Sequence, residues 1–375
     1  MVLLNRIQFA HGAISEAAGE LALAGISRPL VITDAGVVAA GLWEMLRSAL
    51  PAALPLAVFA EVPPNPTEAA VHAAVAAYHS HGADGVLALG GGSPMDLAKA
   101  VALLATHDGE TLTQYSVIEG GLARITARAA PVVAVPTTSG TGSEVSRGAL
   151  IVMADGRKLS IGSPHLIPRA AICDPDLTLG LPPRLTAGTG MDALAHGVET
   201  LCSPRENPIA DAIARDGLRR AWLHLPTAVA DGSDHAARHQ MMLASVEVAL
   251  AFQKGLGAVH ALSHPLGGLA VSPHHGTLNA LLLPHVLRFN APSIGAVLPV
   301  LGEAMGLQDH RAEAIADAIA AMSERIGLPA RLSALGVTPA DLPPLAAAAM
   351  RDHHHLTNPR RTSEVEYLGM LQAAF

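Results

Sequence analysis

The sequence of 375 residues has few aromatic side chains, few charges and almost no cysteine. Aromatic residues make up 3% of the chain, so its core must be built from alanine, leucine and valine, as in packed helices and buried parallel strands. Charged residues make up 15% and apolar residues 50%, which excludes a disordered chain. The two cysteines, Cys173 and Cys202, cannot build a disulfide framework and fit a reducing intracellular compartment.

Long apolar runs and basic clusters are also missing. No stretch reaches about 18 uninterrupted apolar residues, so we expect no membrane-spanning helix. The N-terminus has no basic region followed by an apolar stretch, so we expect no signal peptide and a cytoplasmic protein. The net charge is −8 with neutral histidines, and the basic residues are scattered, so we expect no nucleic-acid partner.

The first 180 residues alternate between short apolar runs and helical stretches, which predicts a doubly wound parallel sheet. The predicted strands are Arg28–Thr33, Leu56–Phe59, Gly85–Leu89 and Pro131–Val135, and the predicted helices are Leu42–Leu50, Glu68–Gly82 and Asp96–Ala105. After Pro182-Pro183 long alanine- and leucine-rich helical stretches follow, namely Met191–Leu201, Ile209–Leu225, His239–Phe252 and Thr277–Phe289. We therefore expect an α/β domain over residues 1–182 and an all-helical domain over residues 183–375.

Two loops after predicted strands favour a nucleotide site. Gly90–Pro94 follows one strand and opens a helix, where glycines and free backbone N–H groups suit a pyrophosphate. Pro136–Glu144, rich in hydroxyls and glycine, follows another strand. Parallel sheets bind ligands at the carboxyl ends of their strands. The alternative is that these loops are a glycine-containing turn and a capped helix start.

Asp34 ends the first predicted strand. Its carboxylate can accept hydrogen bonds from ribose hydroxyls and would repel a 2′-phosphate, which favours NAD over NADP. A simple turn residue is the alternative.

Most of the 19 histidines lie in the second half of the chain, and some of them have helical spacing. Asp192 and His196 are four residues apart, as are His260 and His264, and His274-His275 follows. Spacing of four places both side chains on one helix face. One carboxylate and several imidazoles suit Fe(II) or Zn(II), and one histidine remains for proton transfer. Taken singly, each histidine is more often a structural or surface residue than a ligand.

Five segments in order resemble the iron-containing (group III) alcohol dehydrogenases, and the resemblance runs from about Phe9 to the C-terminus. The segments are Gly90–Ala100, Pro136–Val145, Gly190–His196, Gly255–Gly268 and Asn358–Arg360. The resemblance implies an N-terminal nucleotide-binding domain, a C-terminal helical metal domain and an active site in the cleft between them. It implies hydride transfer between NAD and a small alcohol or its aldehyde, with Fe(II) or Zn(II), in a homodimer. Alternatives are a zinc polyol dehydrogenase of glycerol type, a maleylacetate reductase-like enzyme, or a non-catalytic nucleotide-binding or metal-storage protein.

The resemblance also assigns individual residues. The implied metal ligands are Asp192, His196, His260 and one further histidine, and His264 is the implied catalytic non-ligand. The implied cofactor contacts are Asp34, Gly91, Gly92, Ser93, Asp96, Thr137, Thr138, Thr141 and Lys158.

Three positions in this half leave open questions. The family's Pro-His-Gly is one residue longer here, so the fourth ligand is His275 or His274. His275 is preferred because Gly276 and Asn279 belong to the following helix, which would orient the ligand. Pro265 is expected to disfavour helical geometry at His264. An ω-hydroxy acid such as 4-hydroxybutyrate or 3-hydroxypropionate becomes plausible if Lys254 or His354 faces the active site; otherwise Lys254 is solvated.

Overall fold

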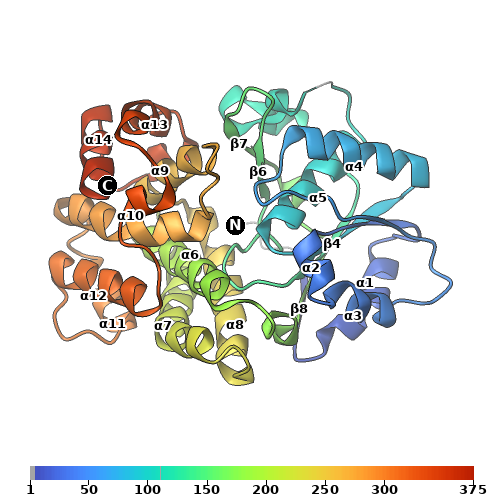
Figure 1. Cartoon of the computed structure of the whole chain (residues 1–375), viewed down its shortest axis with the longest axis horizontal. Helices are drawn as coiled ribbons and strands as arrows, with labels where there is room; N and C mark the ends of the chain where they lie inside the picture. The colour runs from blue at the N-terminus through green and yellow to red at the C-terminus, as the bar shows by residue number, and fades with distance from the viewer. Residues whose placement is uncertain (1–4, 110) are drawn as a thin grey trace. The chain divides into compact units, whose positions relative to one another are not determined.

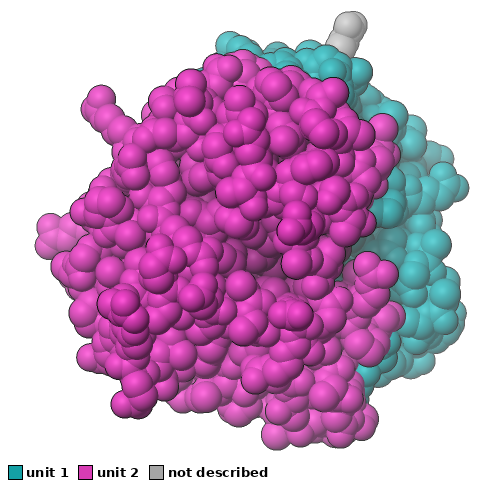
Figure 2. Space-filling model, turned by 60° about the vertical axis from the view of Figure 1, so that its left-hand side comes forward, with its two compact units in different colours: residues 1–138, 143–180 teal, residues 139–142, 181–375 magenta. Residues whose placement is uncertain are grey.

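A six-stranded parallel sheet forms the centre of the first of two units in this computed structural model, which describes residues 5–109 and 111–375 (Figure 1). The first unit comprises residues 1–138 and 143–180, and the second comprises residues 139–142 and 181–375, as coloured in Figure 2. The chain therefore passes from one unit to the other three times.

The strands of the sheet lie in the order β1-β8-β5-β4-β2-β3, and every neighbouring pair is parallel. Their bounds are β1 Arg6–Phe9, β2 Pro29–Ile32, β3 Ala57–Phe59, β4 Gly85–Gly90, β5 Val132–Pro136 and β8 Ala170–Cys173. Strands β2, β4 and β5 are buried along their whole length, as expected where helices cover both faces of a parallel sheet. An antiparallel pair, β6 Gly148–Val152 and β7 Lys158–Gly162, stands apart from this sheet.

Helices of the first unit flank the sheet (Figure 1). They are α1 Ala17–Leu23, α2 Ala35–Ala39, α3 Leu42–Ala49, α4 Glu68–His81 and α5 Gly92–Leu104. The end of α4 follows from the sequence, because Gly82 takes a left-handed conformation with φ 67° that stops the helix.

The strand order reverses beside β2, and this reversal locates the ligand-binding edge. From β2 the chain proceeds to β3 on one side and then crosses to β4 on the other. Ligands of such sheets bind at the carboxyl ends of the strands at this switch point. Asp34 follows β2 and Gly91 follows β4, so both lie at that edge.

The second unit is helical. Its α-helices are α6 Pro183–Cys202, α7 Pro208–Ala230, α8 His235–Ala251, α9 Ala258–Gly267, α10 His275–Asn290, α11 Leu298–Ala304, α12 Ala312–Arg325, α13 Leu342–Ala349 and α14 Glu364–Ala373. Helix α6 is buried from Thr186 to Cys202 by its packing against α7, α8 and α10. The parallel sheet and the helical second half confirm the predicted fold class.

Within residues 5–109 and 111–375, no single helix is both long and apolar enough to cross a bilayer. The segments His235–Lys254 and Ala258–Gly267 are long and apolar enough only when taken together, and the chain bends by 106° between them.

Candidate active site

The loops after β2, β4 and β5 hold most of the residues predicted to contact a nucleotide. Asp34 caps α2, with its Oδ1 accepting from the backbone nitrogen of Val37 at 2.9 Å. Gly91 is the N-cap of α5, and a Cβ built on it would lie 3.2 Å from the side chain of Thr138. The Thr138 hydroxyl is buried and has no hydrogen-bond partner among the described residues. The structure therefore brings Gly91 and Thr138 together with an unused hydroxyl between them.

The other residues predicted to contact the cofactor lie in several different parts of the structure. Gly92 begins α5, and Thr137 is buried at the end of β5. The Ser93 hydroxyl donates to the carbonyl oxygen of Pro64, and Lys158 Nζ donates to Asn65 Oδ1 at 2.8 Å. Thr141 belongs to the second unit.

Asp96 lies in an internal network of the first unit. Its carboxylate accepts from the Ser143 hydroxyl at 2.6 Å and from the backbone nitrogen of Leu150 at 2.9 Å. Lys99, one helical turn later and fully buried, donates to Ser143 and also to the carbonyl oxygen of Gly148 at 2.7 Å. These bonds fix the shape of the hydroxyl-rich loop.

Glu144 gives this loop a pH dependence. Burial raises the pKa of Glu144 to about 7, although the charge of Lys99 opposes the shift. The unfolded carboxyl titrates near 4.5, so this group lowers stability progressively as pH rises from about 4.5 through 7, by at most about 3 kcal/mol. Glu144→Gln is expected to leave the melting temperature unchanged at pH 5 and to raise it by several degrees at pH 8, as measured by calorimetry. An equal shift at both pH values would contradict this assignment.

Asp192 is the centre of a cluster of buried side chains in the second unit. Its Oδ1 lies 3.8 Å from His196 Nε2, 3.7 Å from His260 Nε2 and 3.8 Å from His275 Nε2. Asp192 and His196 lie one turn apart on α6, while the other two imidazoles come from α9 and α10. Ligand atoms of Asp192, His260 and His275 all lie within 4.8 Å of one another, and His196 joins them through its distance to Asp192. His275 rather than His274 is the member of the doubled histidine that lies beside Asp192.

His274 is occupied elsewhere. It is the N-cap of α10, and its Nδ1 accepts from the backbone nitrogen of Thr277 at 3.4 Å. Gly276 lets this end of α10 approach α6, because a Cβ there would meet the carbonyl oxygen of Gly188 at 2.1 Å. This close approach places His275 beside Asp192.

The electrostatics of the cluster follow from burial and mutual charge. Burial raises the pKa of Asp192, but His196 and His275 outweigh it and hold the carboxyl far below its usual range. Burial lowers the pKa of His196 to about 4. Burial also opposes the charged form of His260, but Glu199 and Asp192 raise its pKa to about 9.

The residues fit a divalent metal ion. Distances of 3.7–3.8 Å are too long for hydrogen bonds. They are close to the ~3.4 Å that separates tetrahedral ligand atoms bound at ~2.1 Å. The Asn279 amide nitrogen lies 2.7 Å from Asp192 Oδ1, 3.1 Å from His260 Nε2 and 3.2 Å from His275 Nε2. Several acceptor atoms thus point to one region.

His264 lies next to this cluster and is paired with a carboxylate. Its Nδ1 lies 2.8 Å from Asp352 Oδ2, and its ring stacks on His275 with centroids 5.6 Å apart. Burial raises the pKa of Asp352, but His264 outweighs it and brings that pKa to about 2. Asp352 is therefore ionised at neutral pH and accepts a hydrogen bond from Nδ1–H of His264, which leaves Nε2 as the ring nitrogen outside this pair.

The expectation that Pro265 disrupts the helix at His264 is wrong. Helix α9 runs unbroken from Ala258 to Gly267 with Pro265 inside it. The missing proline N–H removes one bond near the end of this short helix, and burial of nearly every residue of α9 outweighs that loss.

The segment before Asn358 contributes further imidazoles. His354 lies 5.4 Å from His264 and 5.7 Å from His260 between ring centroids. Burial, and then the neighbouring His353, holds the pKa of His354 well below its usual value. Lys254 is not solvated, which corrects that alternative: its Nζ is buried and lies 2.5 Å from Asp211 Oδ1. The Lys254 charge is therefore already compensated within the protein.

Sequence reasoning missed Glu199, Asp352 and the contacts of Asn279. Glu199 lies three residues after His196 and seven after Asp192, so the helical spacing that identified the first pair also reaches it. Asp352 had no such signal, because its partner His264 is 88 residues away.

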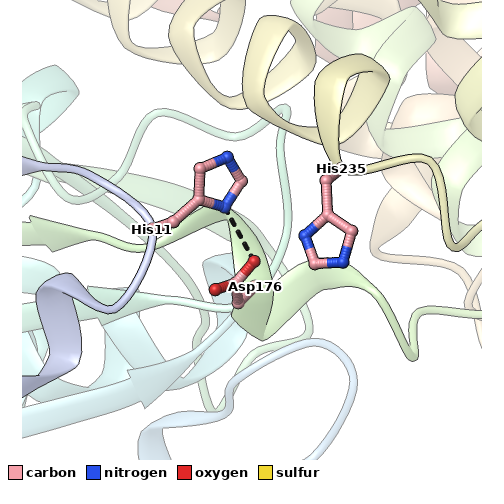
Figure 3. Close-up of side chains that lie close together, drawn as sticks. All are labelled: His11, Asp176 and His235. Atoms are coloured by element: carbon pink, nitrogen blue, oxygen red, sulfur yellow. Dashed lines mark hydrogen bonds and ion pairs between the residues drawn. The ribbon is translucent and has the colours of Figure 1, made fainter.

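A largely exposed imidazole–carboxylate pair lies in the first unit. His11 Nδ1 lies 2.7 Å from Asp176 Oδ1, as Figure 3 shows. The two residues follow the paired strands β1 and β8. Because both side chains are substantially exposed, we assign this pair a small contribution to stability. His235, also drawn there, begins α8 of the second unit.

A parallel-sheet unit with a glycine loop at its switch point and a helical unit with a carboxylate–imidazole cluster are the parts that a nucleotide- and metal-dependent enzyme requires. The chain belongs to the iron-containing alcohol dehydrogenase family. Residues 5–175 match the family described as "Iron-containing alcohol dehydrogenase", and residues 186–375 match "Fe-containing alcohol dehydrogenase family, C-terminal". It is an oxidoreductase of the alcohol dehydrogenase class.

Individual relatives cover essentially the whole chain. A 4-hydroxybutyrate dehydrogenase of Cupriavidus necator is 53% identical over 98% of both chains. The crystal structure of a 1,3-propanediol oxidoreductase is 37% identical, with a TM-score of 0.92 over 100% of this chain and 99% of that one. A sulfoacetaldehyde reductase from Bifidobacterium kashiwanohense, solved in complex with NAD+, is 29% identical, with a TM-score of 0.88 over 100% and 97%.

Proposed function

We propose that this alcohol dehydrogenase interconverts an ω-hydroxy acid, such as 4-hydroxybutyrate or 3-hydroxypropionate, and its aldehyde, with NAD as hydride carrier. The observation that carries the substrate assignment is the 53% identity to a 4-hydroxybutyrate dehydrogenase over nearly the whole chain. In this proposal residues 1–182 form the dinucleotide-binding domain and residues 183–375 the catalytic domain. We also propose that the protein is cytoplasmic and forms a homodimer. Size-exclusion chromatography with light scattering tests the oligomeric state.

We infer that Asp192, His196, His260 and His275 hold Fe(II), with Zn(II) as the alternative ion. Their convergence supports this set, and the capping role of His274 argues against it as the fourth ligand. When bound, such an ion would act as a Lewis acid toward the substrate oxygen. His264, oriented by Asp352, would pass the alcohol proton toward solvent.

We propose that NAD occupies the edge formed by Asp34, Gly91, Gly92 and Thr138, with Ser93, Asp96, Thr137, Thr141 and Lys158 as the remaining predicted contacts. Capping uses Asp34 Oδ1, and no described residue hydrogen-bonds to Oδ2, which supports its availability to a ribose hydroxyl. The unused Thr138 hydroxyl beside Gly91 supports a phosphate contact.

Asp34→Gly is expected to raise the ratio of kcat/KM with NADP to that with NAD by about tenfold, because repulsion of the 2′-phosphate is lost. Asp34→Asn keeps a capping side chain without the charge and is expected to move the ratio in the same direction. Initial rates with both cofactors measure it. If neither variant changes the ratio, Asp34 is only a helix cap.

His354 is the residue that we propose to recognise the substrate carboxylate. It lies beside His264 and His260, whereas Lys254 is held by Asp211. A neutral imidazole donating to a carboxylate is worth about 1.5–3 kcal/mol, or roughly tenfold or more in kcat/KM.

A substrate comparison tests this function. We expect kcat/KM to be higher for 4-hydroxybutyrate than for its neutral counterpart 1,4-butanediol, and His354→Ala to lower it at least tenfold for the acid alone. His355→Ala is the matched control, because His355 instead contacts Tyr367 with Nδ1 3.1 Å from the hydroxyl. A wild-type preference for the diol would overturn the hydroxy-acid assignment while leaving the alcohol dehydrogenase class intact.

A further inference from the structure

Helix α9, which carries His260 and His264, is capped by residues from other parts of the chain. Its N-cap residue is Gly257, which has no side chain to satisfy the first backbone N–H groups. The backbone nitrogen of Ala258 donates to Asn358 Oδ1 at 3.1 Å, and that of Val259 donates to Glu199 Oε1 at 2.8 Å. The start of this helix is therefore fixed by an amide and a carboxylate.

The second oxygen of the same carboxylate contacts an imidazole. Glu199 Oε2 lies 2.5 Å from His260 Nδ1, and both side chains are buried. An ionised carboxylate can only accept, so His260 carries a proton on Nδ1. His260 Nε2, the ring nitrogen that does not face Glu199, lies 3.1 Å from Asn279 Nδ2.

We propose that Glu199 is a positioning residue that fixes the tautomer and orientation of His260 for metal binding. The inference rests on the proposed metal site. The Glu199 carboxylate fixes the start of α9 through the backbone nitrogen of Val259 and holds the His260 ring so that Nε2 faces Asp192, 3.7 Å away. Partners of this kind on the distal nitrogen typically contribute 10–100-fold to metal affinity.

Glu199→Gln separates the two contacts. If the amide oxygen keeps the bond from Val259, the amide NH₂ faces Nδ1, and the proton of His260 must move to Nε2, the nitrogen that would bind the ion. If the amide turns the other way, its NH₂ group faces the backbone N–H of Val259, so the hydrogen bond to Val259 is lost and two donors face each other. In both orientations we expect the Kd for Zn(II), measured by chelator competition, to rise about 10–100-fold.

A second readout is independent of metal. Because the pKa of His260 is raised to about 9, ¹⁵N NMR of the metal-free protein is recorded above that pH, where the wild type is expected to show His260 protonated on Nδ1 alone and Glu199→Gln a changed protonation pattern. Asn358→Ala is the matched control, since it removes the other cap of α9 without contacting His260. It is expected to lower the melting temperature while leaving the Kd for Zn(II) within about threefold.

The outcomes distinguish this inference from the metal site itself. Wild-type Zn(II) affinity in Glu199→Gln, or an equal loss in Asn358→Ala, would overturn the positioning role. If Asp192→Asn also leaves the Kd unchanged, the proposed metal site is wrong. Should Glu199→Gln fail to fold, Glu199→Asp decides the matter: its shorter carboxylate is expected to weaken Zn(II) binding, and unchanged affinity would contradict the proposal.

Discussion

Asp192→Asn is expected to reduce both metal content and turnover severely. Asp192 Oδ1 lies within 3.8 Å of the Nε2 atoms of His196, His260 and His275, and the amide removes its charge while retaining its size. Loss of a Lewis acid worth several kcal/mol corresponds to a fall in kcat/KM of ~10³-fold or more. Elemental analysis of the purified variant and steady-state rates measure the two effects.

Folding must be controlled for in this experiment, because Asp192 is buried and accepts from Asn279 at 2.7 Å. An asparagine can still accept that bond, so the far-ultraviolet circular dichroism is expected to match the wild type. His274→Ala is the companion variant: it removes a neighbouring imidazole assigned to capping and should retain the metal. Full metal content and full activity in Asp192→Asn would exclude the proposed centre.

His264→Ala is expected to separate proton transfer from metal binding. His264 is held by Asp352 at 2.8 Å, and its exchangeable nitrogen is Nε2. Its loss should lower the rate of alcohol oxidation by ~10²-fold, as for a general acid–base partner, with metal content near that of the wild type. Added imidazole is expected to restore part of the rate, which a purely structural role would not allow.

The opposite results have clear meanings. Loss of the metal from His264→Ala would show that the fourth ligand is misassigned. Full activity with full metal would make His264 a structural residue. His353→Ala serves as control, because His353 stacks on His264 at 6.2 Å but is more exposed.

Much of the fold is predictable from local patterns. Strands β2, β4 and β5 are short apolar runs between turn residues, and each lies within one or two residues of its predicted bounds. Strands β1 and β8 were not predicted. Because they pair with each other across more than 160 residues, their strand character depends on partners that are distant in the sequence.

The convergence of the cluster follows from helical spacing, but its supporting contacts do not. Asp192 and His196 occupy one face of α6 by simple periodicity. The choice between His274 and His275 depends on the backbone conformation at the start of α10, which the sequence does not give. His274 caps α10, and His275 faces Asp192. Pro265 shows the limit of local rules, since the packing of α9 overrides them.

Residues 139–142 belong to the helical unit although the α/β unit surrounds them in sequence. A Cβ on Gly140 would lie 2.0 Å from the carbonyl oxygen of Thr189, and one on Gly142 would lie 2.1 Å from Cβ of Ala249. A chimera with a relative, joined by one crossover at residue 180, would therefore graft four foreign residues into the helical core. Domain exchange in this enzyme needs additional crossovers on both sides of the tetrapeptide, so that it is inherited with α6 and α8.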